Sequence, residues 1–294
     1  MPVYEHSYQT WTGERRSALF RWLAIPKFTY LEFFKVRIFV GLLSIACGQF
    51  LFRLAYIYLL VNTEFLKAFR FPTAALPPID AYFFKNMIDV QLLFCFVFAF
   101  VLGADLISRD LHHSVLVLYF SKPISRWEYF LGKFFSVFSL FMGLTWLQAV
   151  LLFVVQAAVA PEHTPWRQHF WSEYAWILRA ITLYAVVVST TLSLMILAAS
   201  SLTKYKRYAG TTFAVYIIGA GIVAAVLNET LHIHEFFAIS PLHAGVDLGN
   251  YLFHVAPSRD MMSQPAAWGG IVGQWLLCAA ILKWRLERAA RYGR

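Results

Sequence analysis

Long apolar stretches alternate with short polar segments along almost the whole chain. Six of these stretches approach or exceed the roughly 20 residues that an α-helix needs to cross about 30 Å of hydrocarbon. They cover residues 38–61, 87–107, 127–159, 174–202, 209–227 and 267–284. Charged residues and prolines collect between them. The pattern predicts a single all-α integral membrane domain over residues 1–294, with six transmembrane helices.

Residues 22–39, just before the first predicted span, suit a helix that lies in the membrane interface. The segment is rich in Phe, Tyr and Leu but carries four charged side chains: Lys27, Glu32, Lys35 and Arg37. Aromatic and basic residues together are typical of interfacial helices. Pro26 favours a break here over a plain extension of the first span, so we expect residues 1–37 to be a cytoplasmic N-terminus with an interfacial elbow helix.

A short helix is also predicted between the fifth and sixth spans, within residues 228–266. Ser240 and Pro241 have the arrangement of an N-cap followed by a first-turn proline, which starts a helix that runs to about Phe253. The whole segment is only moderately polar. We therefore expect a half-apolar helix on the outer side of the last two spans.

Composition excludes a soluble protein. Hydrophobic residues make up 60% of the chain and charged residues only 14%, whereas a soluble domain carries about a quarter charged residues. The net charge is +9, but the basic residues lie at span ends and form no stripe that favours nucleic acid as a partner.

The positions of the basic residues predict the topology. Eighteen of the 25 Lys and Arg residues precede the first span, follow the last one, or lie between spans two and three and spans four and five. All these segments are on one side of the membrane if the spans are six. Basic residues mark the cytoplasmic side, so we expect both termini in the cytoplasm.

Residues 103–133 join the second and third predicted spans and carry the most specific pattern in the chain. Their sequence is GADLISRDLHHSVLVLYFSKPISRWEYFLGK. A short helix is predicted over residues 109–120, and Ser125 with Glu128 fits the S-x-x-E capping box that starts the third span. A separate helix in this connection suggests a docking surface, and an ordinary interfacial linker helix fits the physics equally well.

The run G-x-D-x-I-S-R-D, then an apolar stretch, then S-K-P-I-S-R-x-E-Y-F-L-G-K, resembles the second-span and cytoplasmic-loop signature of ABC-2 type permeases. The stretch ISPLHAGVDL at 239–248 is similar to the helix-forming segment outside the fifth span of these permeases. The six-span layout with an N-terminal elbow matches the whole chain and looks like that of type V exporters. This chain departs from the pattern at Arg109 and Asp110, where the family commonly has Glu-Arg.

The resemblance implies that residues 108–124 hold a coupling helix, which sits in a groove of a separate ATPase subunit. The coupling interface would then comprise Arg109, Asp110, Leu111, His112, His113, Leu116 and Tyr119. The chain has no G-x-x-x-x-G-K-[ST] motif, so we expect ATP and Mg²⁺ on the partner, and no catalytic residue or cofactor here. A second copy or a homologous permease would complete an exporter in the plasma (inner) membrane of a bacterium.

Four charged residues within or near the spans are candidates for the pathway, because charge is expensive in a bilayer and is often functional there. They are Arg53, Asp89, Asp105 and Arg179. For Arg53 we weigh a pathway or interhelical role against snorkelling to the outer interface. We expect Asp105 to pair with Arg109 one turn later, and Asp89 and Arg179 to serve topology and local pairing.

Small residues at four-residue spacing predict close helix contacts. Gly269 and Gly273 form a GxxxG in the sixth span, and Gly221 with Ala225 forms a similar pair in the fifth. Packing inside one bundle explains both pairs. In the resembling family the first and fifth spans meet the partner permease around the pathway, which makes Gly221 a candidate for that interface too.

The external segment holds four histidines, His232, His234, His243 and His254. Such side chains can ligate zinc or copper, but their spacing matches no metalloenzyme template, so we expect solvated histidines and no metal. The leading hypothesis is the permease subunit of an ABC-2 transporter. Two alternatives stay open: a membrane-embedded metalloenzyme that uses these histidines, and a non-transporting subunit that anchors a larger membrane complex.

Overall fold

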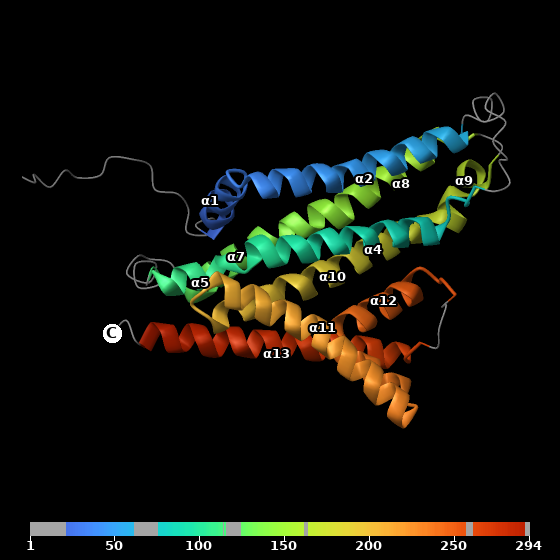
Figure 1. The fold of residues 1–294 in the computed structure, drawn as a ribbon. Coiled ribbons are helices and arrows are strands. Elements are labelled where there is room, and N and C mark those ends of the chain that lie inside the picture. The colour runs from blue at the N-terminus through green and yellow to red at the C-terminus, as the bar shows by residue number, and fades with distance from the viewer. Residues whose placement is uncertain are drawn as a thin grey trace, which may run out of the picture.

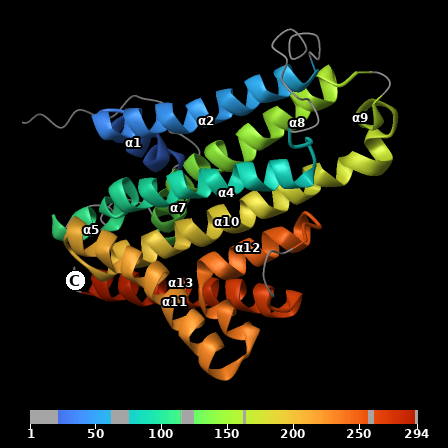
Figure 2. The ribbon, with the colours of Figure 1, turned by 45° about the vertical axis from the view of Figure 1, so that its right-hand side comes forward.

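The computed structural model describes residues 22–61, 76–113, 115, 125–161, 164–256 and 261–291. All regular structure in these ranges is helical. Six helical stretches are long and apolar enough to cross a membrane, and they form one elongated bundle with α11 splayed outward at one end (Figures 1 and 2). The predicted all-α fold with six spanning helices is confirmed.

Four of the six spans are single helices: α2 (Arg37–Val61), α10 (Ala175–Leu202), α11 (Lys206–Leu231) and α13 (Gln264–Arg291). The second span consists of α4 (Ala81–Phe98), the π-helical turn η3 (Ala99–Gly103) and α5 (Asp105–His112). The third consists of α7 (Arg126–Met142), the π-helical turn η4 (Gly143–Leu147) and α8 (Gln148–Val159). Such π-helical turns are frequent at functional sites.

The shorter helices lie before, between or outside the spans. α1 (Ala24–Phe33) precedes the first span, and α9 (Pro165–Gln168) with the π-helical η5 (Phe170–Tyr174) leads into α10. The 3-10 helix η6 (His234–Ile239) and α12 (Pro241–Leu252) lie between α11 and α13.

Side-chain caps define where three helices begin. The Ser125 and Glu128 capping box at the start of α7 is confirmed, with both of its hydrogen bonds present. Ser240 caps α12, and Pro241 occupies its first turn, as predicted. Asp80 starts α4 by accepting a hydrogen bond from the backbone N–H of Phe83 at 3.1 Å.

The second span is longer at both ends than the predicted 87–107. It begins at the cap described above, because Lys85 pairs with Asp89 at 2.6 Å inside the helix and so does not end it. At the other end it runs on to His112, so the start of the predicted coupling helix is the last turn of α5. Residues 114 and 116–124 lie outside the described part of the chain.

α1 is a separate helix that is attached to α7. The break before α2 lies at residues 34–36 and not at Pro26, which sits in the first turn of α1, where its missing N–H breaks no hydrogen bond. Figure 1 shows α1 crossing the start of α2 at a steep angle. The Tyr30 hydroxyl lies 2.7 Å from Ser139 Oγ of α7, and burial raises the pKa of Tyr30 and keeps it neutral. The position of α1 in a membrane interface stays a prediction.

α10 is the central helix of the bundle, and α2 and α11 are peripheral. In the most apolar part of α10, 72% of the residues are buried, against 11% in α2 and 22% in α11. Apolar helices with so little burial need lipid or another protein against them.

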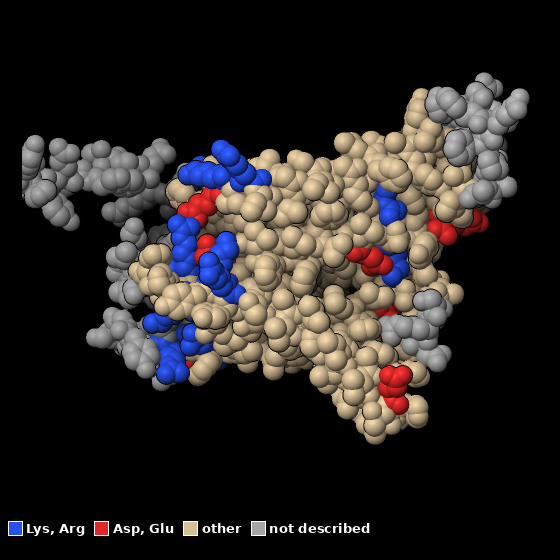
Figure 3. Space-filling model, in the orientation of Figure 1, with Lys and Arg blue, Asp and Glu red and all other residues tan. Residues whose placement is uncertain are grey.

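Basic side chains gather at one end of the bundle. Figure 3 shows most Lys and Arg residues at the end where Figure 1 has α1, α5 and the C-terminus, with little charge midway along this face. We call it the basic end. The span ends that lie here are those that adjoin the Lys- and Arg-rich segments of the sequence.

Candidate functional site

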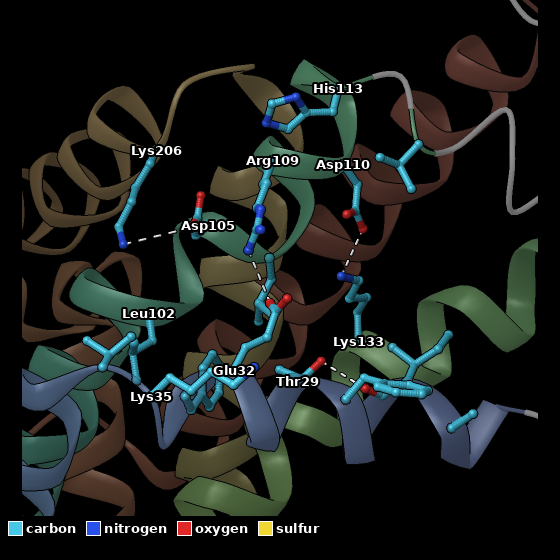
Figure 4. Close-up of a pocket in the computed structure, with 17 residues that line it drawn as sticks. Thr29, Glu32, Lys35, Leu102, Asp105, Arg109, Asp110, His113, Lys133 and Lys206 are labelled. Atoms are coloured by element: carbon cyan, nitrogen blue, oxygen red, sulfur yellow. Dashed lines mark hydrogen bonds and ion pairs between the residues drawn. The ribbon is translucent and has the colours of Figure 1, made fainter.

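At the basic end, side chains of α1, α5, α7 and α11 surround a pocket of about 1030 Å³. Apolar residues such as Ile25, Phe33 and Leu106 line it together with charged ones (Figure 4). Three ion pairs join α5 to its neighbours: Arg109–Glu32 (3.1 Å) to α1, Asp110–Lys133 (2.8 Å) to α7, and Asp105–Lys206 (3.9 Å) to α11. The end of the second span is therefore fixed from three sides.

The Asp110–Lys133 pair is more enclosed than the Arg109–Glu32 pair. Its side chains are 13% and 9% exposed, whereas those of Arg109 and Glu32 are 53% and 60% exposed. Tyr129 donates its hydroxyl proton to Asp110 Oδ2 at 2.7 Å. We call Asp110, Tyr129 and Lys133 the Asp110 clamp. It joins the last turn of α5 to the start of α7, and so holds together the two ends of the loop between the second and third spans.

Gly132 allows α1 to cross α7 at close range. A Cβ atom on Gly132 would lie 2.7 and 2.8 Å from side-chain atoms of Ile25, and 3.1 Å from the carbonyl oxygen of Trp22. These separations are too short for a larger residue in a well-packed contact. The adjacent glycine and lysine of the loop motif thus have different roles: Gly132 admits α1, and Lys133 neutralises Asp110.

The start of α5 is tied to α10 beside the π-helical turn. Ser200 Oγ accepts hydrogen bonds from the backbone N–H groups of Ile107 and Ser108, both at 3.0 Å. The same hydroxyl donates to the carbonyl oxygen of Ala104 at 2.8 Å. Backbone groups released by a π-helical turn need such partners when buried. Sequence reasoning missed Ser200, because a serine in an apolar span gives no sign of the helix that it contacts.

The predicted ion pair between Asp105 and Arg109 is wrong. Asp105 lies 3.9 Å from Lys206 of α11, and Arg109 pairs at 3.1 Å with Glu32 of α1. Their spacing places both residues on one face of α5, but each of them forms its ion pair with a residue of another helix. A local pairing rule could not anticipate these partners, because they come from distant parts of the chain.

The other predicted coupling residues continue from the clamp toward the loop. Leu111 is half-buried and packs against the apolar core, while His112 and His113 are exposed at the C-terminal end of α5. Leu116 and Tyr119 lie outside the described residues. Of these predicted coupling residues, Asp110 and Leu111 therefore pack into the bundle, whereas His112 and His113 are exposed.

Among the intramembrane candidates, Arg53 links two spans and Arg179 does not. Arg53 of α2 donates hydrogen bonds to the carbonyl oxygen of Phe83 at 3.2 Å and to Asn86 Oδ1 at 2.6 Å, both on α4. This is the interhelical role that was weighed against snorkelling. Arg179 is exposed on α10.

Asp89 forms a polar cluster with two residues that sequence reasoning missed. Lys85 Nζ lies 2.6 Å from Asp89 Oδ2, and Tyr184 donates to Asp89 Oδ1 at 2.6 Å. Lys85 lies before the predicted start of the second span at residue 87, and nothing in its own neighbourhood marks Tyr184 as a partner. A Cβ atom on Gly249 of α12 would lie 2.7 Å from Tyr184 Cζ and 3.1 Å from Lys85 Cε. α12 therefore rests directly on this cluster.

Gly269 and Gly273 are exposed on α13 instead of packing inside the bundle. A Cβ atom on either would meet no atom within 4 Å. The close contact belongs to Gly270, where a Cβ atom would collide with the carbonyl oxygen of Ala238. The GxxxG spacing identified the right helix but the wrong face.

Gly221 and Ala225, the pair of small residues in the fifth span, lie in different environments. Gly221 lies under α12, where a Cβ atom would be 3.6 Å from His243 Cε1. Ala225 is exposed. Gly221 thus contacts α12 of the same chain.

The four histidines between the fifth and sixth spans do not converge. His232 and His234 line a pocket of about 440 Å³ at the end of α11, whereas His243 lies on α12 and His254 packs near the ring of Trp176. Within the ranges that the structure describes, no group of three or more His, Cys, Asp or Glu residues is arranged to hold a metal ion. The metalloenzyme hypothesis therefore has no ligand set in those ranges.

Comparison with known protein families gives one match over most of the chain. The family described as ABC-2 family transporter protein matches residues 28–282. The match begins within α1, includes the clamp, and ends in the last spanning helix. None of the curated proteins compared with the chain matches it. With this match, six spanning helices and a loop motif whose residues contact one another, the chain belongs to the ABC-2 transporter family, as a multi-pass membrane permease.

Proposed function

We propose that this permease is driven by a separate ATPase subunit, which acts on the loop between the second and third spans. The observation that carries the proposal is the Asp110 clamp at the base of that loop. An enclosed ion pair with an added hydrogen bond is a rigid connection, because separating its charges in a low-dielectric site is costly. Force applied to the loop would then move both spans together.

Three further contacts extend this connection into the bundle. Ser200 joins the start of α5 to the central helix α10. Arg109 joins the same helix to α1, and Lys206 joins it to α11. A displacement of the loop is thereby shared among five helices, α1, α5, α7, α10 and α11, which suits a coupling element better than an ordinary linker.

The remaining parts of the machine would come from other subunits. The chain lacks a phosphate-binding motif for ATP, so ATP and Mg²⁺ belong on the ATPase subunit. The exposed apolar faces of α2 and α11 fit a second permease, identical or homologous. Each permease would then form half of an export pathway. The basic end fits the cytoplasmic side of a bacterial inner membrane, with both termini there.

Reversal of the charge at Arg109 tests the coupling. The permease is purified with its ATPase and reconstituted, and the stimulation of ATP hydrolysis by the permease is measured together with substrate movement. We expect Arg109→Glu and the helix-breaking Leu116→Pro to remove stimulation while the protein still inserts. Substrate movement that persists after removal of the ATPase would reject the proposal.

The double variant Arg109→Glu/Glu32→Arg separates two causes of such a defect. It restores the ion pair between α5 and α1 with the charges exchanged. If Arg109 acts on the ATPase, the exchanged variant stays uncoupled. Recovery of full stimulation would mean that Arg109 serves only to hold α1.

A further inference from the structure

α4 exposes one stripe of side chains that changes character along its length. Tyr82, Asn86 and Asp89 are exposed or half-buried in the half away from the basic end, and they are followed by Leu93 and Phe100. Leu93 is 64% exposed and Phe100 is 43% exposed. Spacings of three and four residues keep Tyr82, Asn86, Asp89 and Leu93 on one side of α4, and Phe100 follows in the π-helical turn η3. The stripe is thus polar in its outer half and apolar in its inner half.

Arg53 lies beside the polar half of this stripe. Its hydrogen-bond acceptors, the Phe83 carbonyl and Asn86 Oδ1, are both uncharged, and its guanidinium carbon lies 4.9 Å from the centre of the Phe83 ring. Among the described residues no carboxylate lies within ion-pair distance of Arg53. The nearby Asp89 is already paired with Lys85.

None of the ion pairs among the described residues neutralises Arg53. Lys85 and Asp89 cancel each other, and Arg53 remains as a permanent cation within a spanning helix. A guanidinium has five N–H donors, and two of them are used in the contacts above. A charge within a span marks a pathway or a binding site when it is not balanced inside the protein.

Asn86 completes a site for an acid. Its Oδ1 atom accepts from Arg53, so its amide N–H groups stay available to donate to the same ligand. A planar guanidinium and an amide donor side by side match the oxygens of a phosphate or carboxylate. Hydrocarbon attached to such a group would find the exposed side chains of Leu93 in α4 and Phe100 in η3 toward the basic end.

We propose that Arg53 and Asn86 form a recognition site for the acidic head group of an amphiphile, a phosphate or carboxylate on a hydrocarbon chain. This inference rests on the proposed function, in which α2 faces the second permease that completes the export pathway, and it names the chemical class of the substrate. The head group binds in the outer half of the bundle, and the chain lies along the apolar half of the α4 stripe.

The test measures binding of dodecyl phosphate to the full-length permease in neutral detergent by native mass spectrometry. We expect Arg53→Gln to weaken binding at least tenfold, because the counter-charge is lost. Arg179→Gln is the matched control: it removes another arginine from a span and should change the affinity less than twofold. Equal affinities in the wild type and Arg53→Gln, or equal binding of dodecyltrimethylammonium by the wild type, would overturn the proposal.

Asn86→Asp guards against misfolding of the first variant. The new carboxylate lies against Arg53, keeps the contact between α2 and α4, and supplies the counter-charge from within the protein. This substitution should abolish dodecyl phosphate binding, while the temperature at which the protein unfolds stays the same or rises. Retained binding in this variant would also overturn the proposal.

Two sources of the acidic group are distinguished by a parallel titration with phosphatidylglycerol. Arg53-dependent binding of dodecyl phosphate identifies a single-chain ligand, and Arg53-dependent binding of phosphatidylglycerol alone identifies a membrane lipid. Binding of both without dependence on Arg53 refutes the site. The measurement needs no ATPase, so its outcome is independent of the Arg109→Glu experiment: either proposal can fail while the other stands.

Discussion

At the scale of single residues, the loop motif contains two kinds of residue: glycines, which lack a side chain, and polar residues that pair with one another. Gly103 and Gly132 allow close approach, the first against α10 and the second against α1. Asp110, Tyr129 and Lys133 form the clamp. The motif could be recognised from sequence as a signature, but its ion pairs could not be predicted. Asp110 and Lys133 are separated by the loop, and the segment contains other charged residues that could have paired with either of them. Arg109, one residue before Asp110, points to a different helix.

Removal of one clamp partner is expected to destabilise the protein strongly. Lys133→Met leaves Asp110 charged in an enclosed site, which costs about 3–5 kcal/mol for a buried pair. The free energy of unfolding is measured by titration with SDS in mixed micelles. Lys206→Met is the matched control, because its pair at 3.9 Å joins half-exposed side chains and should contribute less than about 1 kcal/mol.

The double variant Asp110→Asn/Lys133→Met tests whether the loss of stability comes from the unpaired charge of Asp110. It removes both charges, so part of the lost stability should return. A Lys133→Met variant as stable as Lys206→Met would show that the clamp is not the rigid connection that coupling requires.

At the scale of elements, caps were more predictable than lengths. Ser125 with Glu128, and Ser240 with Pro241, marked the starts of α7 and α12 correctly, because a cap depends on neighbours in sequence. The second span was predicted too short, because the apolar run alone begins after Lys85. Its charge is balanced one turn later by Asp89, a contact within the same helix that an apolar count ignores.

The external helix α12 should lift from the bundle when Gly249 is enlarged. Gly249→Leu would force side-chain atoms into Tyr184 and Lys85, which a Cβ atom alone would approach to 2.7 and 3.1 Å. Hydrogen exchange of the amides in α12 measures the effect, and we expect it to accelerate at least tenfold. Gly245→Ala is the control in the same helix, because its Cβ atom would lie 4.0 Å from Val188, an ordinary contact. Equal exchange in the two variants would contradict this arrangement of α12.

At the scale of the whole molecule, the sequence predicted the number and order of the spans but not their places in the bundle. α2 and α10 are both strongly apolar, yet α2 is peripheral and α10 central. In a soluble protein the exposed face would be polar and would reveal the difference. Lipid is as apolar as a protein core, so the periodicity that distinguishes the two faces is largely lost. For the same reason, the sequence did not show that Gly269 and Gly273 lie on the exposed face of α13.

The orientation of the bundle is testable with reporter fusions. The basic end should be cytoplasmic, because basic residues are retained on that side. Green fluorescent protein attached after Arg294 should fluoresce, and alkaline phosphatase at the same position should be inactive. Truncation after Leu231, at the far end of α11, should reverse both results. An active phosphatase after Arg294 would put the loop and its clamp outside the cell, where no ATPase could act on them.

The unequal exposure of the ion pairs around α5 has a consequence for ionic strength. In about 1 M salt the screening length falls to about 3 Å, and exposed charges lose most of their attraction while enclosed ones are little affected. Arg109–Glu32 would therefore weaken first and Asp110–Lys133 last. Concentrated salt should release α1 from α5 while the loop stays fastened to α7, so the two attachments can be separated in solution without altering a single residue.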